Sequence, residues 1–87
     1  MSTVGYGVSF VEENIMIKEL DSVVLTVDLP EHGLKTGDVG TVVLMHDSGG
    51  YEVEFITLGG ATLAVMTLTH DQVRAVGGRE IAQARVL

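Results

Sequence analysis

A β-hairpin pattern in the middle of the chain constrains the fold more than any other feature of the sequence. Residues 51–55 alternate strictly, with apolar side chains on one face and acidic side chains on the other. This period-two pattern is typical of a strand that is buried on one side. The turn sequence Asp-Ser-Gly-Gly at residues 47–50 joins this strand to a β-branched stretch at residues 39–46. The centre of the chain is therefore predicted to be an antiparallel pair of strands.

A polar, glycine-containing turn leads into this hairpin. Within residues 34–43, Gly37 and Asp38 form a tight turn, and the strand that follows contains Gly40. Glycine inside a strand indicates a bulge, a bend or a close approach of another backbone. In the loop before this turn, Pro30 ends the preceding strand, and Gly33 is expected to adopt a positive φ. We interpret residues 34–43 as an architectural corner, with leucines at both ends of the loop fixing it to the core.

Three further strands complete an all-β pattern. Residues 21–28, 61–68 and 73–76 are rich in Val, Leu, Ala and Thr, which favours strands. A single helical turn, capped by Thr69, is expected before the last strand. Five short strands with short turns predict a small five-stranded SH3-like barrel. We assign residues 16–76 to this barrel.

The two ends of the chain fall outside the predicted barrel. Residues 1–15 form an N-terminal extension, which is either a flexible segment or an extra edge strand that pairs with a sheet. Residues 77–87 form a C-terminal tail, which is either a short helix or a frayed end.

Composition narrows the function classes. Twelve acidic residues against five basic ones give a formal net charge of −7, which disfavours nucleic acid as a partner because phosphate binding needs clustered Lys and Arg. The chain has no cysteine, which fits a reducing compartment. We find no signal-peptide pattern and no apolar run long enough to span a membrane. A cytoplasmic location without membrane association is the expectation.

The combined pattern resembles an uncharacterised bacterial family, the domain of unknown function numbered 4926. The resemblance rests on residues 16–25, 28–34, 37–43 and 50–55. It implies an SH3-like barrel and names no activity. The Gly-Asp-x-Gly-x-Val turn is also similar to the KOW motif and to the barrel of the nitrile hydratase β-subunit. Small proteins of this type also occur as mobile gene-cassette products of integrons.

The histidines and carboxylates give no clear catalytic or metal-binding constellation. His46-Asp47 and His70-Asp71 repeat a His-Asp pair, yet a metal site needs a third nearby ligand and a base needs a nearby nucleophile. Glu52 and Glu54 share one face of a strand, a spacing that acid–base chemistry can use when one carboxylate is desolvated. We interpret all of these as ordinary turn or surface residues. We therefore predict no catalytic residue, no metal and no cofactor.

Two strands carry apolar residues on both faces. We expect Val42 and Leu44 on one strand, with Ala64 and Met66 on the other, to lie outside the barrel. Exposed apolar patches of this kind mark interaction surfaces. We therefore predict a homo-oligomer formed through these four residues. In the alternative, the terminal segments cover them within one chain.

The sequence is most consistent with a non-enzymatic protein–protein interaction module that self-associates. This module is also compatible with being the small partner of a protein encoded by a neighbouring gene. The alternative is a small-molecule-binding protein, with a pocket beneath the loop at residues 29–35 or between subunits. In that alternative, His32, Leu34, Tyr51 and His70 are the expected binding residues.

Overall fold

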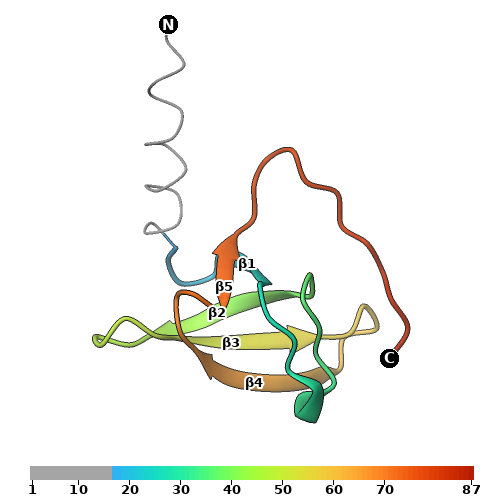
Figure 1. Ribbon diagram of the computed structural model, residues 1–87, viewed down its shortest axis with the longest axis horizontal. Coiled ribbons are helices and arrows are strands. Elements are labelled where there is room, and N and C mark those ends of the chain that lie inside the picture. Colours follow the sequence, from blue (N-terminus) through green and yellow to red (C-terminus); the bar gives the residue numbers. More distant parts are fainter. Residues whose placement is uncertain (1–16) are drawn as a thin grey trace, which may run out of the picture.

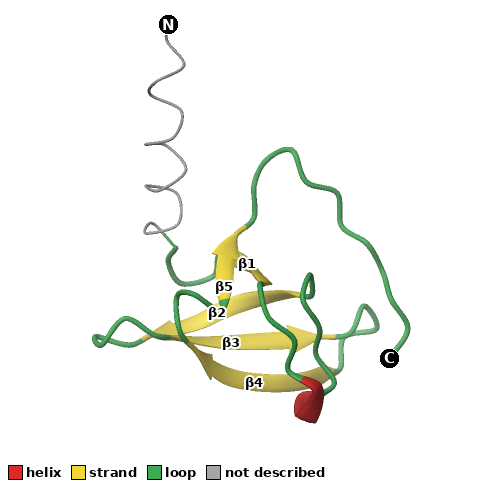
Figure 2. Ribbon diagram, in the orientation of Figure 1, coloured by secondary structure: helices red, strands yellow, loops and turns green. Residues whose placement is uncertain are grey.

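The computed structural model describes residues 17–87, which form one open sheet of five antiparallel strands (Figures 1 and 2). The strands are β1 (Ser22–Leu25), β2 (Val39–Met45), β3 (Tyr51–Ile56), β4 (Thr62–Leu68) and β5 (Val73–Ala75). The prediction of an all-β domain with five short strands is therefore confirmed. The predicted N-terminal extension at residues 1–15 lies outside the described residues.

The strands follow a simple path. β1 to β4 form a meander, and β5 returns to pair with the free side of β1, so the order across the sheet is β4-β3-β2-β1-β5. Val23 pairs with Gly40 on one side and with Ala75 on the other. Figure 1 shows β1 and β5 at a steep angle to β3 and β4, so the sheet curls around its inner face. The sheet stays open between its two edge strands, β4 and β5.

The core lies on the inner face of the curled sheet. Tyr51, Val53 and Phe55 are buried there, as the alternation predicts. The remaining buried residues of this cluster are Ile17, Val23, Leu25, Leu34, Val42, Leu68 and Val73. Each of the five strands therefore contributes at least one fully or nearly fully buried side chain.

Gly40 on β2 leaves no room for a side chain beside β3. A Cβ atom at this position would lie 2.6 Å from Val53 Cγ1, 2.8 Å from Phe55 Cε1 and 3.0 Å from the main-chain oxygen of Glu54. Real Cβ atoms essentially never lie closer than 3.0 Å to such a neighbour. The sequence signal at Gly40 therefore reflects a close approach of β2 to β3 and the side chains beneath them.

The loop between β1 and β2 is closed on itself. Leu29 and Leu34 exchange two main-chain hydrogen bonds, of 2.9 and 3.1 Å, and Leu34 is buried while Leu29 packs against the core. Between them lies the 3-10 turn η1 (Pro30–His32), which ends at Gly33 with a φ of 71°. Both leucines fix the loop as predicted.

The helical turn that the sequence predicts before the last strand is instead a hydrogen-bonded turn, and the helical turn of the described residues is η1. In the predicted region, the Gln72 N–H donates to the Thr69 carbonyl, at 3.0 Å. The Gln72 side-chain oxygen accepts a hydrogen bond from the Thr69 N–H, at 2.8 Å. Gln72 thereby closes the turn at once, and β5 begins at the next residue. Pro30, with its fixed φ, suits the first position of a helical turn.

A β-bulge in β2 changes which side chains face outward. Val42 pairs with Val53, but the next paired residue, Leu44, lies opposite Glu52. Val43 is therefore an extra residue on β2. Because a shift by one residue exchanges the two faces of a strand, Leu44 lies on the opposite face from Val42 although the two are two positions apart.

The C-terminal tail forms neither a helix nor a strand. Figure 1 shows that it leaves β5, turns back and runs past the sheet. The Glu80 carboxylate accepts hydrogen bonds from Arg74, at 2.7 Å, and from the Gly77 N–H, at 2.6 Å. Arg85 binds the turn before β2. The tail is thus attached by polar side chains at two points.

Candidate functional site

The outer face of the sheet, opposite the core, carries exposed apolar side chains on two strands. On β2 they include Val43 and Leu44, which are 40% and 47% exposed, and on β4 they are Leu63 and Val65, which are 39% and 54% exposed. β4 is at the edge of the sheet, and it has no charged residue from Thr62 to Leu68.

The structure corrects the predicted assignment of faces. Val42 is completely buried in the core, and Ala64 and Met66 pack against the core from the inner face. Of the four residues predicted to form an oligomer interface, Leu44 alone is exposed. Leu44 reaches the outer face because of the bulge at Val43. On β4, pairing with β3 decides the faces, because Ala64 and Met66 lie opposite the buried Phe55 and Val53.

The acidic row of β3 runs between the two apolar strands and is fully engaged in hydrogen bonds. The Thr67 hydroxyl donates to Glu52, whose Oε2 also lies 2.8 Å from His46 Nε2. The Thr62 hydroxyl donates to Glu54 at 2.8 Å. The hydrogen bonds from Thr67 and then His46 lower the pKa of Glu52. A general acid needs a raised pKa, so the direction of this shift argues against Glu52 as a general acid.

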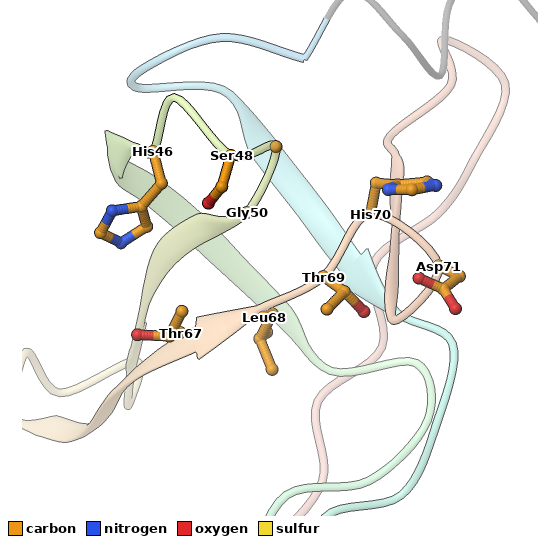
Figure 3. Close-up of a pocket in the computed structure, with 9 residues that line it drawn as sticks. His46, Ser48, Gly50, Thr67, Leu68, Thr69, His70 and Asp71 are labelled. Atoms are coloured by element: carbon orange, nitrogen blue, oxygen red, sulfur yellow. The ribbon is translucent and has the colours of Figure 1, made fainter.

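A shallow depression lies beside this face, at the end of the β2–β3 hairpin. It has a volume of about 510 Å³ and is bounded by the hairpin turn, the end of β4 and the turn at residues 69–72. Ser48, Thr67 and Thr69 are among the residues that line it (Figure 3). His46 and His70 lie at opposite ends of the depression, and their rings do not converge on a common point.

The contacts of His46 do not form a catalytic arrangement. In nucleophilic catalysis, the hydroxyl donates to the base and the base is oriented by a carboxylate. Here both His46 and Thr67 bind the same carboxylate, Glu52, so the hydroxyl has no base to activate it. Within residues 17–87, no three His, Asp or Glu side chains are grouped so that they could hold a metal ion. The prediction that the protein is not an enzyme stays a prediction.

The four residues predicted to bind a small molecule are not brought together. Leu34 and Tyr51 are buried in the core. His32 is exposed on η1, and it is not among the residues that line the depression to which His70 belongs. The structure therefore assigns Leu34 and Tyr51 to packing, and among these four only His70 lines the depression described above.

A contact that the sequence did not reveal joins the tail to the turn before β2. Arg85 Nε donates to Asp38 Oδ1 at 2.8 Å, and Arg85 Nη2 donates to Asp38 Oδ2 and to the Gly33 carbonyl, both at 2.7 Å. Asp38 and Arg85 are separated by 47 positions. A spacing of this kind carries no periodic signal, so sequence reasoning had no means to find the pair.

The chain belongs to a family described as a domain of unknown function, DUF4926, which matches residues 19–75. The match covers about two thirds of the chain and includes all five strands. It confirms the family to which the sequence patterns pointed, and it assigns no activity. Searches of curated proteins and of solved structures found no match. None of the helical segments within residues 17–87 has the length and apolar character that a membrane crossing requires.

Proposed function

We propose that this protein is a non-enzymatic, cytoplasmic interaction module that self-associates through the edge strand β4. The observation that carries the proposal is β4 itself. It is a seven-residue edge strand without a charge, and it exposes Leu63 and Val65 beside an unpaired main-chain edge. Proteins usually protect such edges with lysine, proline or a short strand, because an open edge pairs readily with another strand.

The described tail does not supply a cover for this strand. Residues 76–87 are present in the structure, yet Leu63 and Val65 stay exposed. The tail's own apolar residues, Ile81 and Val86, are each 95% exposed. An intramolecular cover by the C-terminal tail, one of the alternatives left open by the sequence, is therefore not supported by this arrangement.

The charges of the sheet favour pairing by the edge over stacking by the face. If two outer faces stacked, sheets about 10 Å apart would oppose their rows of Glu52 and Glu54. If two β4 strands paired, three strand spacings, or about 14 Å, would separate the two β3 strands. That distance exceeds the Debye length of about 8 Å at physiological ionic strength. Edge pairing therefore joins the apolar strands while it keeps the acidic rows apart.

The proposed association through β4 should depend on salt concentration. With a net charge of −7 on each chain, two copies repel one another over long distances, and added salt screens that repulsion. Self-association through an apolar, uncharged strand should therefore strengthen as ionic strength rises. An association based on oppositely charged patches would weaken under the same change.

A pair of matched lysine variants tests the proposal. Val65→Lys places a charge on the middle of β4, and Val43→Lys places one on the same face of the sheet at β2. Sedimentation velocity across the micromolar range should show that the wild type and Val43→Lys associate, whereas Val65→Lys is monomeric. A monomeric wild type would overturn the proposal. Equal loss of association in both variants would point instead to stacking of the outer faces.

The predicted partner from a neighbouring gene stays a prediction, and it is compatible with the same strand. An open strand edge can accept any extended segment, since main-chain hydrogen bonds supply affinity and alternate side chains supply specificity. Competition between self-association and a second protein for β4 would be the simplest relation between the two.

A further inference from the structure

The turn before β2 has the features of a built site for a guanidinium group. Asp38 offers both carboxylate oxygens to Arg85, with contacts of 2.8 and 2.7 Å, and the Gly33 carbonyl accepts a third hydrogen bond at 2.7 Å. This two-pronged geometry matches the fixed fork of arginine and no other side chain. The Asp38 side chain is only 18% exposed.

The acceptors of this site are held in place by the family domain, without help from arginine. The Lys35 N–H donates to Asp38 Oδ2 at 2.8 Å, and the Asp38 N–H donates to the Lys35 carbonyl at 3.0 Å. Gly37, with a φ of 97°, allows the tight turn between them. Two hydrogen bonds to Leu25, both of 2.9 Å, tie Gly37 and Asp38 to β1.

The local charge also favours a cation. Asp28 lies at the same turn, where its carboxylate accepts a hydrogen bond from the Thr36 N–H at 2.8 Å. The charge of Asp38 acts on Asp28 in the direction that raises the pKa of Asp28, although the hydrogen bonds from Thr36 outweigh it and lower that pKa. The Arg85 hydrogen bonds lower the pKa of Asp38. The charge of the nearby Lys35 ammonium acts on the pKa of Asp38 in the same direction, as a smaller contribution.

The ligand of this site is attached to its own chain by very little else. None of the main-chain to main-chain hydrogen bonds of residues 17–87 involves residues 76–87. The anchors of the tail are the side chains of Glu80 and Arg85, and its apolar residues Ile81, Val86 and Leu87 are exposed. The site lies within the family domain, residues 19–75, and Arg85 lies beyond it.

From these observations, we propose that the turn at residues 33–38 is a guanidinium-binding site that accepts the arginine-bearing C-terminal segment of a second copy as well as its own. The hydrogen bonds that hold Arg85 run from its own side chain to Asp38 and to the Gly33 carbonyl, and hydrogen bonds within residues 19–75 tie Asp38 in place. The same contacts therefore form whether the segment belongs to the same chain or to another. The segment's high local concentration favours its own site, so exchange is revealed when that competition is removed.

Two complementary variants remove the competition from the protein's own C-terminal segment. Arg85→Ala leaves the site intact without its ligand, and Asp38→Asn leaves the ligand intact without its site, because an amide lacks the charge and directs N–H groups toward arginine. When unlabelled Asp38→Asn is added to ¹⁵N-labelled Arg85→Ala, the amide signals of Gly33 and Asp38 should move toward their wild-type positions and saturate. The matched control is the unlabelled double variant, which should leave these signals in place.

The outcomes separate cleanly. No movement with Asp38→Asn, or equal movement with the double variant, would overturn the proposal. A free peptide of residues 79–87 gives a second measurement that does not need Asp38→Asn to fold, and the same peptide with Arg85→Ala is its control. Repeating the titration with Val65→Lys in both chains distinguishes this site from β4, because tail exchange should persist when pairing of β4 is lost.

Discussion

Replacing Gly40 with alanine should destabilise the protein strongly, although it adds only one methyl group. The new Cβ atom would lie 2.6 Å from Val53 Cγ1 and 2.8 Å from Phe55 Cε1, both on core side chains, and 3.0 Å from the main-chain oxygen of Glu54. Overpacking a well-packed core costs about 1–3 kcal/mol. Because one of the three obstacles is backbone in a paired strand, we expect the upper part of this range, about 2–3 kcal/mol.

Urea unfolding followed by far-ultraviolet circular dichroism measures this loss directly. A loss of this size is a large share of the roughly 5–15 kcal/mol that stabilises a small domain. The matched control is Gly59→Ala, where the nearest atom to the new Cβ is Thr57 Oγ1 at 3.8 Å, and the change should stay within about 0.5 kcal/mol. If Gly40→Ala were as stable as Gly59→Ala, the close approach of β2 and β3 described above would be wrong.

Two further predictions concern the sheet. Val42→Ala should lower the free energy of unfolding by about 1.5–3 kcal/mol, because Val42 is fully buried. Val43→Ala should change the free energy of unfolding by less than about 0.5 kcal/mol. If urea unfolding gave the reverse order, the bulge would lie elsewhere in β2. Thr67→Val should be less stable than the wild type at neutral pH, and the difference should shrink as the pH falls below the ordinary pKa of glutamate. The sign follows from Glu52, whose pKa the Thr67 hydroxyl lowers in the folded state, so the stabilisation is present when the carboxylate is charged and is lost as it becomes protonated. The control is Thr41→Val, because Thr41 on β2 lies opposite Glu54 on β3. If the difference in stability between Thr67→Val and the wild type grew toward acid pH, the assigned hydrogen bond from Thr67 to the Glu52 carboxylate would be wrong.

The sequence predicted the strands well where one face is apolar and the other polar. Tyr51, Val53 and Phe55 point into the core because glutamates separate them, and this alternation leaves a single choice of face. Where both faces are apolar, the pattern cannot choose. Ala64 and Met66 on β4 were assigned outward, yet their pairing with Phe55 and Val53 turns them inward. That information resides in the register between strands and not in β4 itself.

The sequence did not predict the bulge in β2 or the contact between Arg85 and Asp38, and the reasons differ. Val43 is one β-branched residue among several on β2, so nothing in its local sequence marks it as the extra residue that turns Leu44 outward. Asp38 was identified as a turn residue, and it is one. Asp38 also binds Arg85, which is 47 positions away in the sequence and comes close only in the folded chain. Leu34 and Tyr51 were considered as binding residues, although leucine is among the residues most often buried and Tyr51 belongs to the inward-facing set of β3.

The return of β5 to β1 has a consequence for how the domain folds. The meander of β1 to β4 consists of neighbours in sequence, whereas the three paired positions between β1 and β5 join residues near the two ends of the family domain. Closing so long a loop costs entropy before its contacts contribute. We therefore expect the hairpins to form early and the β1–β5 ladder to form last. Once folded, this short ladder should also open at a lower free energy than the centre of the sheet, so that the ends of the domain loosen while the β2–β3 hairpin stays intact.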